Sequence, residues 1–350
     1  IIERNGAEIR VPGYSTDNYT QWACDYIKGE GRDKAKPWFL WLCYGAIHGP
    51  STPAPRHLGK YAQEPVPPPS DILPPRPQKP AYLDKVQAWH RGPNGEIVAG
   101  ATEAKFGDEG ARQKTHADWV RQVNECMLAL DEGVGRVIQS LRDSGQLENT
   151  LVVYTADQGF GMGEHGFRSK LAPYDATFNS PLIVSFPKQL PEGKVCQGPV
   201  CGGDLVATFF AYAGLELPWK IHGRDLTAVF KNPELREQPR ALLLEEMGEF
   251  YGSATHPIPT DEHLYHSGVP RWIAIRYGPY KYIRTLVAGE MEEIYDVEKD
   301  PEELTNLALL PEHAKLLVEL RGRAVEELRR TEAPFADSMP PTRQMAAARK

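Results

Sequence analysis

The hydrophobic positions of the chain follow two spacings, which predict helices and strands in alternation. From His116 to Ser144 apolar residues recur every three or four positions, as on one face of a helix, and Gly145 ends that pattern. The apolar, β-branched run 151–154 follows at once and is typical of a strand buried on both faces. Further helices are expected at about 16–28 and 204–212, and further strands at 38–44 and 182–186. This order predicts an α/β fold whose mainly parallel sheet is sandwiched by helices.

After about residue 238 the pattern changes. Short strand candidates separated by turns are followed by an amphipathic helix that begins at Pro311; the candidates are 241–245, 271–277, 281–285 and 293–297. We therefore expect an α/β domain at 1–237, with an exposed proline-rich loop at 65–80, and a small antiparallel α+β subdomain at 238–331. The tail 332–350 is expected to be poorly ordered.

The strongest chemical signal lies directly after the strand 151–154. Asp157 and Gln158 offer two hard oxygens at the carboxyl end of the strand, where open α/β sheets place their ligand sites. Such a pair is half of a site for a calcium or magnesium ion. Lys170 brings a cation back to the same edge after a loop with glycines at 159, 161, 163 and 166. A metal ion beside a lysine indicates a site for an oxyanion ester.

Each of these residues also has a simpler interpretation. An aspartate close to a glycine after a strand is most often part of a turn. Lys170 alone fits a solvated surface charge, and His165 alone fits a hydrogen-bonded loop residue. The order of strand, acid, amide, glycine and lysine is much more specific than its parts and favours the ligand site.

Three segments resemble the sulfatase family, a branch of the alkaline-phosphatase-like superfamily. They are Thr155-Ala-Asp-Gln-Gly159 with Gly163-Glu-His-Gly-Phe-Arg-Ser-Lys170, then Pro37-Trp-Phe-Leu-Trp-Leu-Cys-Tyr-Gly-Ala-Ile-His48, and finally Gly278-Pro-Tyr-Lys-Tyr-Ile283 with Glu293-Ile-Tyr-Asp-Val-Glu-Lys-Asp-Pro-Glu302. The three segments stand in the order that the family has. The resemblance therefore implies an alkaline-phosphatase-like fold.

The resemblance also implies hydrolysis of a sulfate monoester. Asp157 and Gln158 would be ligands of Ca²⁺, with Mg²⁺ as the other option, and Lys170 would bind a sulfate oxygen. His48 would bind substrate and protonate the leaving oxygen, although a histidine in a turn also often bonds a carbonyl. His165 is a candidate for a substrate contact. The expected substrate is a small sulfate ester or a sulfated glycan.

Part of the family's site has no counterpart in the chain. Sulfatases carry a pair of aspartates and a Cys-x-Pro-x-Arg motif whose cysteine is oxidised to formylglycine, and none of the five cysteines stands in that pattern. Because the other site residues are kept together, we expect a C-terminal portion of a sulfatase. Its formylglycine nucleophile would lie in an upstream segment, and this piece alone would be inactive. The chain begins Ile1-Ile2, so its sequence leaves the cellular location open, with export as one option.

Two other functions stay open. A phosphonate monoester or phosphodiester hydrolase of the same superfamily would have a nearly identical metal rim. A catalytically inactive sulfatase-like binding domain would keep the fold without the chemistry. To distinguish these functions from a sulfatase, the nucleophile must be identified and the rates of hydrolysis of sulfate and phosphate esters must be compared.

The composition of the chain excludes some further classes of protein and leaves two questions about its cysteines and histidines open. The net charge of −7 over 350 residues, without a long basic run, argues against nucleic-acid binding. Apolar runs are too short to span a bilayer. Five cysteines leave at least one unpaired, and pairing of Cys196 with Cys201 stays open. His256, His263 and His266 suggest either a second metal site or, more simply, surface loop histidines.

Overall fold

The computed structural model describes residues 2–100, 115–235 and 240–347, and its chain divides into two compact units. The first unit comprises Ile1–Pro68, Trp89–Val152 and Phe186–Lys188. The second comprises Pro69–Ala88, Val153–Ser185 and Gln189–Lys350. The expected domain boundary between residues 237 and 238 lies outside the described residues.

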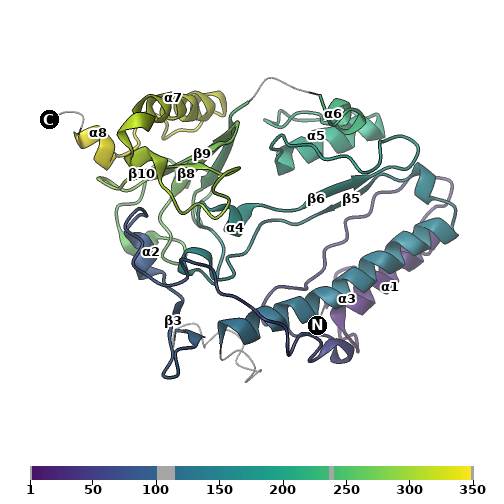
Figure 1. Ribbon diagram of the computed structural model, residues 1–350. Helices are drawn as coiled ribbons and strands as arrows, with labels where there is room; N and C mark the ends of the chain where they lie inside the picture. Colours follow the sequence, from purple (N-terminus) through teal and green to yellow (C-terminus); the bar gives the residue numbers. More distant parts are fainter. Residues whose placement is uncertain (1, 101–114, 236–239, 348–350) are drawn as a thin grey trace. The chain divides into compact units, whose positions relative to one another are not determined.

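Two long helices form the body of the first unit. Helix α1 (Ser15–Lys28) packs along α3 (His116–Asp143), as Figure 1 shows. The helices approach closely because Gly133 has no side chain; a Cβ there would lie 2.6 Å from Thr20 Oγ1. Both helices were predicted within two residues of their observed ends. Short hairpins complete this unit: β1 (Ile2–Arg4) with β2 (Ala7–Ile9), and β3 (Trp89–Arg91) with β4 (Ile97–Ala99).

The segment 38–44 corrects one prediction, because it is not a strand. Its residues pair with no strand among those that the structure describes. Phe39 and Trp41 are 65% and 72% exposed. An apolar run rich in aromatic residues has the right side chains for a central strand, but a strand exists only where neighbouring backbones supply hydrogen bonds.

Strands β5 (Val152–Thr155) and β6 (Leu182–Ser185) form a two-stranded sheet that belongs to the second unit from Val153 on, and both strands were predicted. Helix α5 (Gly202–Ala213) was also predicted, with Asp204 as its cap. Asp204 instead lies one turn inside and accepts a hydrogen bond from the backbone N–H of Cys201 at 3.0 Å, in a capping box. The remaining short helices are α2 (Tyr82–Lys85), α4 (Asp175–Phe178) and α6 (Thr227–Lys231).

The C-terminal sheet is antiparallel throughout, as the sequence predicted. Its strand order is β10-β9-β8-β7, so consecutive strands are neighbours. The bounds are β7 (Leu242–Glu246), β8 (Trp272–Tyr277), β9 (Tyr280–Thr285) and β10 (Glu292–Asp296). Short connections join β8 to β9 and β9 to β10, as antiparallel neighbours allow, whereas the longer segment 247–271 joins β7 to β8.

Both faces of this sheet are buried, and the alternation of side chains divides them between two cores. The helix face carries Ile273, Ile275, Tyr282 and Ile294, which pack against α7 (Ala314–Arg330), seen above the sheet in Figure 1. The loop face carries Trp272, Ala274, Ile283 and Tyr295, which pack against Tyr82, Leu83, Phe167 and Tyr174. The second core thus joins the C-terminal sheet to the loop that follows β5.

The segment after α7 also differs from its expectation, since residues 332–347 are folded onto the subdomain. Phe335 is buried in the core on the helix face, and α8 (Arg343–Ala347) follows. Thr342 Oγ1 donates to the buried Glu292 carboxylate at 2.7 Å. Prolines in this segment suggested disorder, but the burial of one aromatic ring and the bonds to Glu292 outweigh local composition.

Candidate functional site

The rim after β5 presents its two predicted metal ligands on a loop. The side chain of Asp157 is exposed, and its Oδ1 accepts a hydrogen bond from the backbone N–H of Gln158 at 3.0 Å. Gln158 is half-buried, and its amide group makes no hydrogen bond to another described residue. Both side chains therefore keep oxygen lone pairs available for a ligand.

Two glycines hold this loop against the rest of the second unit. A Cβ on Gly159 would lie 2.6 Å from Ala176 O, so the backbone of the loop touches the backbone at α4. Gly166 has φ +82°, and a Cβ there would lie 2.1 Å from Gln87 Oε1. Only glycine fits either place, which explains part of the glycine pattern in the sequence.

Lys170 lies between two anchored peptide groups. Ser169 O accepts from the backbone N–H of Gly161 at 2.8 Å, and Leu171 O accepts from the indole N–H of Trp272 at 2.6 Å. Leu171 adopts φ +80°, an uncommon conformation for a branched residue. Lys170 is half-buried as a residue, and its ammonium group has no hydrogen-bond or ion-pair partner in the described part of the chain. The backbone is thus fixed while the charge stays available.

His165, by contrast, is a buried residue that is fully engaged by the protein. It is 2% exposed, and its ring Nδ1 lies 2.6 Å from Asp71 Oδ2. Its backbone N–H donates to the other oxygen of Asp71 at 2.9 Å, and its ring packs on Tyr174 at 4.1 Å between centroids. A side chain held this way suits positioning of the loop better than contact with a substrate.

Burial and the charge of Lys79 lower the pKa of His165 to about 4, even though the hydrogen bond to Asp71 acts in the other direction. Burial also acts to raise the pKa of Asp71, but the hydrogen bonds from His165 and the charge of Lys79 leave it below its usual value. At neutral pH the pair is therefore a neutral imidazole donating its Nδ1 hydrogen to a carboxylate.

This pair predicts a pH dependence of stability. Because the folded pKa of about 4 lies below the ordinary 6.5, the unfolded chain binds the His165 proton more readily. The contribution of His165 is complete above pH 6.5 and is lost as the pH falls toward 4, by up to about 1.4 kcal/mol per pH unit. In urea unfolding, the free-energy advantage of the wild type over His165→Gln should shrink across that window.

The matched control is His263→Gln, which changes an exposed histidine in the same unit. Its unfolding free energy should run parallel to that of the wild type from pH 7 to 4.5. Parallel curves for His165→Gln as well would contradict the assignment of a neutral, buried His165.

Behind the loop lies a buried charge cluster, Lys79, Lys281, Glu293 and Glu303, which sequence reasoning missed. Lys281 contacts both Glu303 and Asp175, the latter at 2.7 Å, and Lys79 donates to the backbone carbonyl of Glu303. Burial lowers the pKa of Lys79 to about 8 and raises the pKa of both glutamates. Two cations and two anions balance, which is how such charges are tolerated in an interior.

The same cluster holds Tyr174, the tyrosine of the loop-face core. Its hydroxyl donates to Glu293 Oε2 at 2.9 Å, and Lys79 lies 4.0 Å from the centre of its ring. A signal was present in the sequence: charged residues interrupt the short strands 281–285 and 293–297 on a face that otherwise reads as buried. Without the pairing of these strands, such charges look like ordinary surface residues.

His48 belongs to the first unit, in the turn after residues 38–44. It is exposed, and its Nδ1 lies 3.2 Å from Gly49 O. The turn is tied to α3 because Gln122 Nε2 donates to Ser51 O at 2.8 Å. The structure brings Asp157, Gln158 and Lys170 onto one loop of the second unit, whereas the meeting of His48 with them stays a prediction.

Candidate metal ligands are few. Across residues 2–100, 115–235 and 240–347, no three His, Cys, Asp or Glu side chains gather in a metal-binding arrangement, so the three histidines 256, 263 and 266 form no such site. All five cysteines are free thiols, including Cys196 and Cys201.

No described helix has the length and apolar character needed to cross a membrane.

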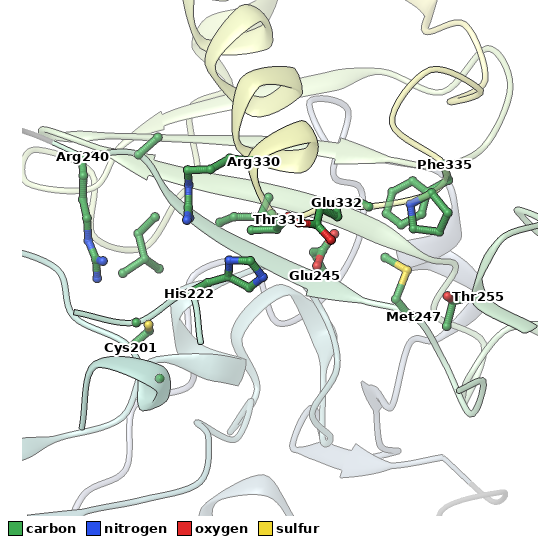
Figure 2. Close-up of a pocket in the computed structure, with 17 residues that line it drawn as sticks. Cys201, His222, Arg240, Glu245, Met247, Thr255, Arg330, Thr331, Glu332 and Phe335 are labelled. Atoms are coloured by element: carbon green, nitrogen blue, oxygen red, sulfur yellow. The ribbon is translucent and has the colours of Figure 1, made fainter. Parts of the chain in front are cut away.

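A cavity of about 420 Å³ lies in the second unit, and Cys201 is among the residues that line it (Figure 2). Arg240, Arg330 and His222 border it together with Glu245 and Glu332. None of the five predicted site residues lines it. Its cations are already engaged in part, since Arg240 contacts the buried Asp204 and Arg330 binds Glu327 at 2.7 Å.

Comparison with known proteins identifies the family. The family model described as sulfatase matches residues 2–215, and the model of the C-terminal part of N-sulphoglucosamine sulphohydrolase matches residues 163–331. The chain belongs to the sulfatase family. The family in general employs a metal ion and formylglycine.

Individual relatives agree with this assignment. An N-acetylglucosamine-6-O-sulfatase of Bacteroides thetaiotaomicron is 27% identical over 96% of this chain and 64% of its own length. A solved structure in complex with its substrate D-glucosamine-2-N,6-O-disulfate has a TM-score of 0.76 at 24% identity, covering 95% of this chain and 73% of that one. The phosphonate monoester hydrolase of Silicibacter pomeroyi has a TM-score of 0.70 at 20% identity, covering 92% and 62%.

These neighbours establish the alkaline-phosphatase-like fold that the sequence predicted. The chain spans just under two thirds of the length of the first curated relatives that it matches.

Proposed function

We propose that the protein hydrolyses a sulfate monoester, with Lys170 as the cation that binds a sulfate oxygen. The observation that carries this proposal is the geometry at Lys170. The backbone carbonyls of Ser169 and Leu171, the residues on either side, accept hydrogen bonds at 2.8 and 2.6 Å. The ammonium group of Lys170 has no hydrogen-bond or ion-pair partner among the described residues. A lysine held by its backbone and left unpaired is prepared to stabilise negative charge that develops on an ester oxygen.

The donor set of Asp157 and Gln158 fits a hard divalent cation such as Ca²⁺. Asp157 is exposed and uses one oxygen for a single hydrogen bond, so its other lone pairs are available. A bound calcium ion would neutralise charge on the sulfate oxygens. The two residues supply part of a coordination sphere, and further oxygens would have to come from elsewhere.

His48 is proposed as the general acid. Its exposed ring, in the protonated state, would give its proton to the bridging oxygen as the sulfur–oxygen bond breaks, so the alcohol leaves uncharged. The turn that carries it is fixed through Ser51 and Gln122, which limits its motion. The nucleophile is not assigned within residues 1–350, because no cysteine stands in the family's Cys-x-Pro-x-Arg pattern.

The substrate class that we propose is a sulfated amino sugar or a glycan that contains one. Support comes from the relative named as an N-acetylglucosamine-6-O-sulfatase and from the neighbour bound to a glucosamine disulfate. The second candidate is a phosphonate monoester hydrolase, because such an enzyme shares the fold at a TM-score of 0.70.

The test compares the two ester classes with one enzyme. The protein is expressed from its whole reading frame, in a host that makes formylglycine, and assayed with 4-nitrophenyl sulfate, glucosamine-6-sulfate and a 4-nitrophenyl phosphonate. We expect kcat/KM for a sulfate ester to exceed that for the phosphonate by at least tenfold. The reverse ratio would establish the phosphonate activity, and no turnover of any ester would favour an inactive binding domain.

A further inference from the structure

The loop face of the C-terminal sheet makes direct contact with the segment that carries Lys170. Trp272 on β8 is 4% exposed, and its indole N–H donates to Leu171 O at 2.6 Å. This carbonyl belongs to the residue directly after Lys170, in the peptide group that joins residues 171 and 172. On β10, Glu293 accepts from the hydroxyl of Tyr174, four residues further along the same segment.

These contacts are directional, and the groups that make them are costly to bury. Glu293 is 0% exposed and also accepts from Tyr295 at 2.5 Å, and Lys281 on β9 reaches Asp175 at 2.7 Å. Well-packed apolar side chains would stabilise the core equally well or better than buried charges. What hydrogen bonds and ion pairs add is a fixed position for their partners. Three of the bonded partners, Leu171, Tyr174 and Asp175, lie on the short segment that follows Lys170.

We propose that the C-terminal sheet positions Lys170 for sulfate binding, with Trp272 and the Tyr174–Glu293 pair as positioning residues. This inference rests on the proposed role of Lys170. The indole N–H of Trp272 holds the Leu171 carbonyl and thereby the uncommon φ of +80° at that residue. The orientation of the peptide groups around Lys170 follows from that anchor, which restricts the positions that the ammonium group can reach.

The test removes one hydrogen bond from each face of the same sheet. Trp272→Phe removes the indole donor on the loop face, and Tyr174→Phe is a second, smaller change on that side. Tyr282→Phe is the matched control, because it removes a buried hydroxyl that donates to Glu292 at 2.7 Å on the helix face. Amide hydrogen exchange of a peptide covering 167–173 is measured for each variant, beside the midpoint of urea unfolding.

We expect exchange in 167–173 to accelerate at least tenfold in the two loop-face variants and to stay unchanged in the control, at similar unfolding midpoints. With the whole reading frame, kcat/KM for 4-nitrophenyl sulfate should fall about 10- to 100-fold in Trp272→Phe, since small misplacements of a binding group have effects of that size. The control should stay within threefold.

Unchanged exchange in Trp272→Phe, or equal acceleration in Tyr282→Phe, would overturn the positioning role. The proposed function can fail separately. A wild type that cleaves only phosphonate esters would refute the sulfatase activity, while the exchange data and the kinetics with that ester would still decide whether the sheet positions Lys170.

Discussion

Replacing Asp157 by asparagine is expected to lower kcat/KM for a sulfate ester by about 10³-fold and to weaken Ca²⁺ binding by at least 100-fold. The change keeps the size of the side chain but removes the only carboxylate among the predicted ligands. A metal ion contributes several kcal/mol to stabilising charge in such a reaction, and each 1.36 kcal/mol is a tenfold effect. The measurements are a calcium titration by calorimetry and steady-state kinetics with added Ca²⁺.

The control for Asp157→Asn is Asp337→Asn, which makes the same chemical change at a carboxylate that is 77% exposed and paired with Arg329. It should leave both calcium affinity and kcat/KM within threefold. If Asp157→Asn binds calcium as tightly as the wild type does, the metal site lies elsewhere.

The second large effect is expected at Lys170. Substitution by methionine keeps most of the side-chain length and removes the charge that is proposed to bind a sulfate oxygen. Because that charge acts on oxygens that become more negative in the transition state, kcat/KM should fall about 10²- to 10³-fold, as for loss of one oxyanion donor. Lys170→Arg should restore part of the activity, since guanidinium keeps the charge with a different geometry.

Lys299→Met serves as the control for this series. Its side chain is 83% exposed and forms an ion pair with Asp296 at 3.1 Å on the surface of the C-terminal subdomain. The kinetics of this variant should match those of the wild type within threefold. Lys170→Met with unchanged kcat/KM would mean that another cation binds the ester.

The contacts of Lys170 connect these predictions to the fold. Trp272 and Glu293 lie on β8 and β10, roughly a hundred residues or more after the loop in sequence, yet they bond the segment 171–175 directly. The small C-terminal subdomain thus forms part of the support of the candidate site. The buried Glu293 and Lys281 of this subdomain hold Tyr174 and Asp175 on the segment after Lys170. In an independent domain these charges would have no such partners.

Sequence alone determined the local elements and the candidate chemistry. Helices 116–143 and 15–28, and the strands of the C-terminal sheet, were predicted within about two residues, because helical and strand periodicity is a local property. The loop with Asp157, Gln158 and Lys170 was identified from the order of its residues. The assignment of the chain to the sulfatase family was confirmed by the family model that matches residues 2–215.

Only the tertiary structure decided which side chains are buried and what they contact. The apolar run 38–44 forms no strand in the described chain, because pairing depends on neighbours that periodicity does not specify. His165 stands in the rim motif, yet Asp71, 94 residues earlier, holds it in the interior. Lys281 and Glu293 looked like surface charges until the antiparallel register turned them to the loop face. Contacts between residues far apart in sequence set burial, and burial sets which of these groups can act on a ligand.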